Sequence, residues 1–374
     1  MPGIRRAGLI VNPVAGMGGA VGLKGTDGLV ETALQLGAVQ VSVGRAVRFL
    51  GKLKPLGGAI DFVTCPGEMG EEAFRRASLP FRMLSGMERK GRTTSDDTKL
   101  AAAKMLEEGV EVIAFCGGDG TARDIFDTVG DRVPVIGIPA GVKMHSGVFA
   151  VSPEAAAGIL VRFLWGELPL KEAEVADVDE EAFRQGRVSS RIYGYMNVPY
   201  DPERVQGTKV ASQLIGDVSE NALAIAEWIV EGMEGGVTYV LGPGSTVKKI
   251  NQVLGIEGSQ LGVDVVRDKR LVAADASEEI VFRNVRDGKA RIIVSPIGNQ
   301  GFIFGRGNQQ ISPRVIRAVG KENVLVIATR EKLRWTRCLR VDTGDPEIDA
   351  LFLGPMRVVA DYNFAKIMMV AGTE

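Results

Sequence analysis

The feature that most constrains the fold is an apolar run that ends abruptly in a glycine-rich turn. Residues 110–116 are mostly apolar and β-branched, which is typical of a strand buried on both faces of a parallel sheet. The sequence GGDGT, residues 117–121, follows at once, and residues 122–129 have a helical pattern. This strand, turn and helix unit predicts an α/β protein with a doubly wound sheet.

The turn has the chemistry of a phosphate site, with one unusual residue. Glycines let a ligand approach backbone N–H groups closely, and a helix start adds N–H donors and a partial positive charge. Asp119 is the exception, because a carboxylate repels a phosphate unless a metal or a transferable proton lies between them. We therefore predict that Gly117, Gly118, Gly120 and Thr121 bind phosphate and that Asp119 is catalytic.

GGDGT resembles the signature of the superfamily that joins NAD kinases with diacylglycerol and sphingosine kinases. The segment NPVAGMGG, residues 12–19, is similar to a loop of the archaeal and AcoX-like ATP-NAD kinase branch. The resemblance implies an NAD kinase-like N-terminal domain, a second mixed, β-rich α/β domain, and a homo-oligomer such as a dimer or tetramer. It also implies a small-molecule kinase that takes phosphate from ATP or polyphosphate with Mg²⁺ or Mn²⁺.

The amino-acid composition limits the kinds of binding partner and the cellular location that we expect. The 374 residues include 45 Lys and Arg and 46 Asp and Glu, so no general basic field favours a nucleic-acid partner. The three cysteines are far apart in the sequence, which favours a reduced, cytoplasmic setting. The apolar N-terminal run is too short for a signal peptide or a membrane span, so we expect no membrane partner. The expected substrate is a small nucleotide, as the resemblance implies.

A second glycine-rich loop follows the strand expected at residues 7–11. It fits neither GxGxxG nor GxxxxGK[ST], which excludes the standard dinucleotide and P-loop fingerprints. A flexible surface loop is the alternative to a phosphate loop. We favour the phosphate loop because it follows a buried strand at the edge where such sheets bind ligands. The candidate phosphate-binding residues of this loop are Asn12, Gly16, Gly18 and Gly19.

The start of the helix expected after residue 94 offers two interpretations. Thr94, Asp96 and Asp97 suit N-capping and a helix dipole. Alternatively, Thr94, Asp97 and Thr98 face the nucleotide or its metal, as the resemblance implies.

The segment after the strand expected at residues 133–138 departs from ordinary NAD kinases. Pro139 stands where the resembled motif has asparagine. Lys143 and His145 follow at a carboxyl end of the sheet, where they could meet phosphates, although a lone histidine is often structural.

A further departure concerns the ribose motif that the resemblance places near residue 197. Asn197 matches, but Val198 replaces the acid, which argues against NAD itself as the acceptor. Asp201 and Glu203 could substitute for that acid or bind a metal, or they could be solvated turn residues.

A second strand, glycine turn and helix unit lies at residues 237–253. Gly244, Ser245 and Thr246 stand at its helix start and are predicted to bind phosphate. Further along, three side chains suit carboxylate or phosphate recognition: Arg306, Asn308 and Gln309.

The resulting hypothesis is metal-dependent phosphoryl transfer, with Asp119 as base or metal organiser. A metal-dependent phosphatase acting on small phosphoesters is the alternative, and a non-catalytic nucleotide-binding protein is the third reading. The candidate metal ligands are Asp96, Asp97, Asp119, Asp124 and Asp201.

The expected domains are a nucleotide-binding domain at residues 1–150 and a substrate domain at residues 151–350. A tail, residues 351–374, could return to the first domain.

Overall fold

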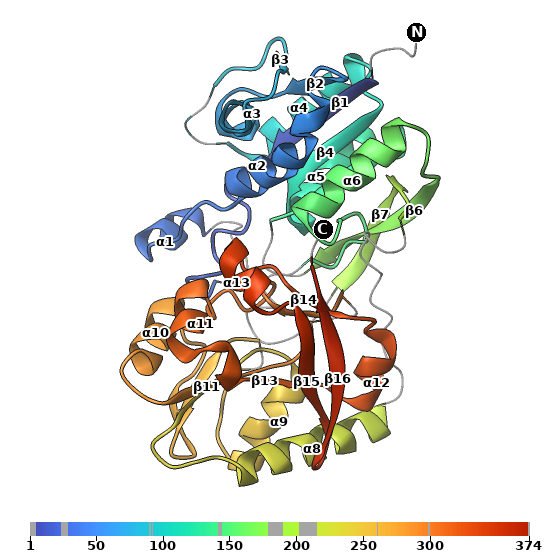
Figure 1. Cartoon of the computed structure of the whole chain (residues 1–374). Helices are drawn as coiled ribbons and strands as arrows, with labels where there is room; N and C mark the ends of the chain where they lie inside the picture. The colour runs from blue at the N-terminus through green and yellow to red at the C-terminus, as the bar shows by residue number, and fades with distance from the viewer. Residues whose placement is uncertain are drawn as a thin grey trace. The chain divides into compact units, whose positions relative to one another are not determined.

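The chain divides into two compact units (Figure 1). The computed structural model describes residues 5–23, 29–89, 91, 93–140, 144–178, 190–201, 215–259, 261–297 and 300–372. The first unit contains most of the chain up to Thr208, and the second contains Gly18–Lys24 and Lys209–Thr373.

The first unit is built on a five-stranded sheet in which all neighbouring strands are parallel. The strand order reverses at the centre, where the first strand of the chain lies beside the fourth. Ligands of such sheets bind at this switch point, outside the carboxyl ends of the strands. In sheet order the strands are β3 (Arg82–Met83), β2 (Ile60–Thr64), β1 (Arg5–Val11), β4 (Val112–Gly117) and β5 (Val135–Pro139).

Helices pack on this sheet through apolar side chains. Ala101, Met105, Ala122 and Ile125 belong to one buried cluster that also contains Phe115 of β4. Because β4 is buried along its whole length, its apolar sequence is explained by contacts on both faces. The helices of this unit are α1 (Val30–Gln35), α2 (Ser42–Leu53), α3 (Glu71–Ala77), α4 (Ser95–Glu107), α5 (Asp119–Val129) and α6 (Pro153–Leu164), with 3-10 turns η1 (Lys54–Leu56) and η2 (Gly67–Met69).

An antiparallel hairpin of β6 (Leu170–Val178) and β7 (Ser190–Pro199) also belongs to the first unit. The ring of Tyr193 meets the ring of Phe126 edge-on at 5.8 Å, and a Cβ on Gly194 would overlap the Phe126 ring. The hairpin therefore packs tightly on α5. This packing draws residues 151–201 into the first unit, whereas the sequence-based boundary placed them in the second.

The second unit contains a nine-stranded mixed sheet. Neighbours β8, β11, β13 and β15 run parallel, whereas β9 pairs antiparallel with β8. In sheet order the strands are β10 (Arg270–Ala273), β9 (Asp264–Arg267), β8 (Thr238–Leu241), β11 (Ala290–Val294), β13 (Val324–Ile327), β15 (Gly354–Asp361), β16 (Phe364–Ala371), β14 (Leu339–Val341) and β12 (Phe302–Phe304).

The helices of this unit cover both faces of its sheet. Ile293 of β11 shares a buried cluster with Val247 and Ile250, whereas its neighbours Ile292 and Val294 face a second cluster. The helices are α8 (Ile215–Glu231), α9 (Ser245–Leu254), α10 (Glu278–Val285), α11 (Pro313–Val319), α12 (Arg330–Trp335) and α13 (Pro346–Leu351), with the 3-10 turn η4 (Lys321–Asn323). The predicted fold class, a parallel N-terminal α/β domain with a second mixed domain, is confirmed.

The end of the chain stays with the second unit. β15 and β16 pair with each other and lie inside the nine-stranded sheet, beside β13 and β14 (Figure 1). We predicted that residues 351–374 could return to the first domain. Instead, residues 351–372 belong to the second unit, where β15 and β16 pair with strands of its sheet. Over the described residues, no helix combines the length and apolar character needed to cross a bilayer.

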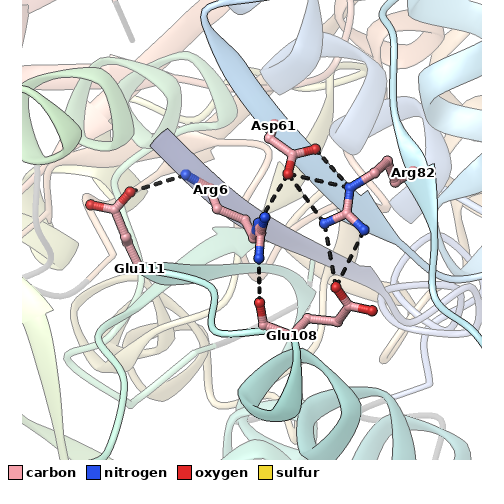
Figure 2. Close-up of polar contacts among 5 residues, drawn as sticks. All are labelled: Arg6, Asp61, Arg82, Glu108 and Glu111. Carbon is pink, nitrogen blue, oxygen red and sulfur yellow. Dashed lines mark hydrogen bonds and ion pairs between the residues drawn. The ribbon is translucent and has the colours of Figure 1, made fainter. Parts of the chain in front are cut away.

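A network of ion pairs joins the amino ends of the strands in the first unit (Figure 2). Asp61 accepts from the guanidinium groups of both Arg6 and Arg82, each at 2.9 Å. Arg82 also reaches Glu108, and the backbone N–H of Arg6 donates to Glu111. These charges lie at the opposite edge of the sheet from the strand ends that carry the glycine turns, which indicates a structural role.

Asp61→Asn is expected to lower the free energy of unfolding by about 1 kcal/mol at neutral pH, because the pairs are partly exposed. The hydrogen bond from Arg82 lowers the pKa of Asp61 below its ordinary value of 3.8. The carboxylate therefore stabilises the fold above that value, and this contribution is lost as the pH falls through the lowered pKa. Urea unfolding of both proteins from neutral pH to about pH 3 should show the difference shrinking in acid.

Asp131→Asn is the matched control, since Asp131 has no ion pair among the described residues. It should change stability little at any pH. A difference for Asp61→Asn that stays constant down to the acid end would contradict the assignment.

Candidate active site

The loops that follow β1 and β4, the two strands at the switch point of the first sheet, contact each other. Asn12 follows β1, and its backbone N–H donates to the carbonyl of Cys116 in β4 at 2.9 Å. Its side-chain amide donates to the Thr121 hydroxyl at 2.9 Å, and its side-chain oxygen accepts from the Val14 N–H. Asn12 thus ties the start of the glycine-rich loop to the first turn of α5.

Two glycines are required by the close packing of these loops. A Cβ on Gly117 would overlap the Thr121 side chain. Gly16 has a φ of 80°, and a Cβ there would overlap the backbone carbonyl oxygen of Ala140. The beginning of the glycine-rich loop is therefore packed against the end of β5, unlike a flexible surface loop.

Asp119 is the first residue of α5, and its carboxylate holds the loop that follows β5. Ser146 donates to Oδ1 through its backbone N–H at 2.9 Å and through its hydroxyl at 2.6 Å. The His145 backbone N–H donates to Oδ2 at 2.8 Å. A carboxylate at a helix N-terminus is favoured by the helix dipole. Asp119 therefore has an evident structural task in addition to any chemical one.

Ser146 and His145 surround this carboxylate. The Ser146 hydroxyl also accepts from the Ala176 N–H at 3.0 Å, which links α5 to β6. Nδ1 of the His145 ring lies 3.4 Å from Oδ2 of Asp119, and the ring is 5% exposed. The structure thus brings His145 to Asp119, as the sequence suggested, whereas Lys143 lies outside the described residues.

Sequence reasoning missed Ser146. The sequence signal for Ser146 was that it forms, with His145, a pair of polar residues after a buried strand, at the carboxyl edge of the sheet. A serine in such a loop is common, however, and only the approach of β6 from residues 170–178 creates its second hydrogen bond.

The start of α4 forms a capping box. The Asp97 carboxylate accepts from the backbone N–H of Thr94 at 2.9 Å and from its hydroxyl at 3.1 Å. Thr98 is buried and Asp96 is exposed. This geometry supports the capping interpretation, and it commits the Asp97 carboxylate to the helix end.

The predicted metal ligands do not come together. Asp201 forms an ion pair with Arg162 at 2.6 Å, Asp124 is buried on α5, and both oxygens of Asp119 already accept hydrogen bonds. Within the described ranges, no group of three or more His, Cys, Asp or Glu side chains could hold a metal ion. The five predicted acids therefore do not fit a metal site made by protein side chains alone, and Glu203 lies outside the described residues.

Asn197 also lies away from the predicted position. Its amide donates to the carbonyl of Asp131, just beyond the last residue of α5. Helix α5 has 11 residues, so Asn197 is about 15 Å from the Asp119 end. Val198 beside it is buried in the core. The structure therefore does not bring Asn197 to the Asp119 turn, because the register of the hairpin places it at the amino edge; nucleotide binding by Asn197 stays a prediction.

In the second unit, the predicted glycine turn stands where it was expected. Gly244 ends the connection from β8 with a φ of 113°, and Ser245 and Thr246 are the first residues of α9. Ser245 is exposed and Thr246 is buried. Gly18 and Gly19 also belong to this unit, since Gly18 accepts from Leu23 in a turn grouped with it.

Three other polar candidates have structural contacts. Asn308 accepts from the Gly305 N–H and donates to the Ile303 carbonyl, which closes a turn after β12. Arg306 stacks on Phe302 at 4.3 Å. Arg306 also lies 3.5 Å from the buried Asp342, whereas Gln309 is partly buried.

Comparison with known families decides the assignment. Residues 8–168 match the ATP-NAD kinase N-terminal domain, and residues 234–370 match the ATP-NAD kinase C-terminal domain. The chain belongs to the ATP-NAD kinase superfamily. A comparison with curated proteins gives no match.

In this ATP-NAD kinase superfamily member, the two matches follow the two sheets. The N-terminal match contains the second half of β1, the GGDGT turn and the loop with Ser146. The C-terminal match contains β8 through most of β16, including the Gly244 turn. Membership of the archaeal and AcoX-like branch stays a prediction.

Proposed function

We propose that the chain is an ATP-NAD kinase-like small-molecule kinase that transfers a phosphoryl group to an alcohol of a nucleotide. The observation that carries the proposal is Asp119 at the start of α5, in a glycine turn at the switch point of a parallel sheet. Membership of the superfamily supports the reaction class. ATP is the proposed donor, with polyphosphate as the other candidate.

The glycine turn would hold the donor phosphates. The first N–H groups of an α-helix have no partner within the helix, and Gly118 and Gly120 add no side chain over them. These N–H groups and the dipole of α5 favour the charge of a phosphate. Positioning and charge stabilisation are the main needs of phosphoryl transfer.

Asp119 would receive the proton of the acceptor hydroxyl. In the reaction, the hydroxyl oxygen forms a bond to the terminal phosphorus of the donor as the bond to the leaving phosphate oxygen breaks. A carboxylate has about four lone-pair positions, and the longest contact of Asp119 is the one to the His145 ring, at 3.4 Å. We propose that the acceptor hydroxyl displaces this ring from Oδ2, while Ser146 keeps its bonds to Oδ1.

A divalent metal would supply charge neutralisation for the phosphates. Mg²⁺ commonly binds through substrate phosphates with few protein ligands, which agrees with acids that do not form a metal cluster by themselves. The phosphatase alternative depended on such a cluster, and the described residues do not support it.

Mass analysis of reaction products would test the proposal. The purified protein is incubated with ATP, Mg²⁺ or Mn²⁺, and a pool of acceptors that includes NAD. A gain of one phosphoryl group on an acceptor, lost in Asp119→Asn, is the expected result and would name the substrate. Phosphate release from phosphoesters without ATP, and no phosphorylated acceptor, would reject the kinase.

A further inference from the structure

Three groups that can donate hydrogen bonds to an anion lie at the carboxyl edge of the second sheet. β8 and β11 are parallel neighbours, and the Gly242 N–H donates to the Ile293 carbonyl at 2.8 Å. Just beyond the ends of these strands, the chain reaches Gly244, which caps α9, and Ser295. Adjacent strands are about 4.8 Å apart, so the start of α9 and Ser295 leave the same edge of the sheet from neighbouring strands.

Strand alternation places both groups on the same face. Ile293 packs in the cluster with Val247 and Ile250 of α9, and Ser295 has the same parity as Ile293. Helix α9, with 10 residues, has a full set of N-terminal N–H donors. Ser295, two residues beyond Ile293, is also buried, with 3% of its surface exposed.

Lys332 of α12 completes the cluster. Its Nζ donates to the Ser295 hydroxyl at 3.0 Å, which leaves the serine its O–H and the ammonium two further N–H groups to donate. Among the residues that the structure describes, no carboxylate lies within 4.0 Å of this ammonium group. Burial lowers the pKa of Lys332 to about 8.

A second lysine in the same unit, Lys248, has its positive charge paired with a carboxylate. Lys248 Nζ lies 2.7 Å from the carboxylate of Asp264, which is fully buried. That charge is neutralised inside the protein, whereas within the described ranges the ammonium group of Lys332 contacts a hydroxyl and no carboxylate. Lys332 is partly buried, and charges withdrawn from water are normally paired. A counter-ion is missing among the described residues, which points to an anionic ligand.

We infer that Lys332, Ser295 and the N-terminus of α9 form a phosphate-binding site for a nucleotide in the second unit. The inference rests on the proposed function for the nature of the ligand, a nucleotide phosphate. It assigns new roles to Lys332 and Ser295 and gives Gly244 and Ser245 a cationic partner.

Inorganic pyrophosphate is a suitable probe, because it tests binding without turnover. Calorimetry should show that Lys332→Met weakens one pyrophosphate site at least about tenfold, since charge-assisted hydrogen bonds to phosphate are strong. Ser295→Ala should weaken it less. Lys249→Met is the matched control, because Lys249 lies on α9 but contacts Gln252, and it should bind like the wild type.

Two further measurements locate the site and confirm folding. Acetylation of Lys332, followed by peptide mass analysis, should be slowed by pyrophosphate, while Lys249 is acetylated at an unchanged rate. In buffer without multivalent anions, the melting temperature of Lys332→Met should equal or exceed that of the wild type, because an uncompensated charge has been removed.

Pyrophosphate binding by Lys332→Met within about twofold of the wild type would overturn the inference. Absence of pyrophosphate binding by the wild type would overturn it as well. A protein that binds pyrophosphate through Lys332 but phosphorylates no acceptor would reject the proposed kinase and leave this site standing.

Discussion

Replacing Asp119 by asparagine is expected to reduce phosphoryl transfer by at least about a thousandfold. The amide cannot take the proton of the acceptor hydroxyl. Its NH₂ group would also face either the His145 N–H or the Ser146 donors, which bond the carboxylate in this structure. An unsatisfied donor of this kind costs about 1–3 kcal/mol, so the variant should be less stable yet folded.

Two controls separate chemistry from loop positioning. Ser146→Ala keeps the carboxylate but removes two hydrogen bonds, the one to Asp119 and the one from the Ala176 N–H, so it should lose about 1–3 kcal/mol of stability and far less activity than Asp119→Asn. Asp127→Asn makes the same chemical change further along α5, where Asp127 contacts Lys99 and Tyr193, and should retain near-normal turnover. Turnover is measured by product mass and stability by urea unfolding. An Asp119→Asn protein with more than about a tenth of wild-type turnover would refute the catalytic role.

Gly16→Ala is expected to have a large effect for a single added methyl group. At a φ of 80°, alanine costs about 1–2 kcal/mol, and its Cβ would overlap the Ala140 carbonyl oxygen. Because that oxygen belongs to the backbone, the loop after β1 must move away from the end of β5. We expect a loss of at least about 2 kcal/mol in the free energy of unfolding and weaker ATP binding.

Gly44→Ala is the matched control for this prediction. Gly44 lies on α2 in the same unit, has no neighbour within 4 Å of an added Cβ, and has no positive φ. In a helix, alanine is favoured over glycine by up to about 1 kcal/mol, so this variant should be slightly more stable. Urea unfolding and ATP titration of both variants would check the pair, and a Gly16→Ala protein as stable as Gly44→Ala would contradict the packing argument.

The local units of the first sheet could be predicted from the sequence because their signals are local. The apolar run expected at residues 110–116 is β4, and the helix expected at residues 122–129 is α5, extended at its start to include Asp119. The turn at Gly244 likewise follows a strand and begins a helix, as predicted. Apolar length, glycine position and helix start each depend on residues close in the chain.

The long-range partners could not be predicted in this way. Asp201 is an acid that the sequence offers as a metal ligand, but folding pairs it with Arg162, 39 residues away. Asn197 matches a motif by position, yet the hairpin register carries it to the far end of α5. A side chain's partner depends on which elements pack together, and motif spacing carries no information about that packing.

By itself, the sequence determined the fold class, the strand, glycine turn and helix units, and the presence of Asp119 in one of them. Only the tertiary structure decided which groups surround that carboxylate, which acids form ion pairs or cap helices, and that Lys332 donates a hydrogen bond to Ser295. The physical reason is that backbone conformation follows from neighbouring residues, whereas charge compensation and hydrogen bonding depend on groups brought together from distant parts of the chain.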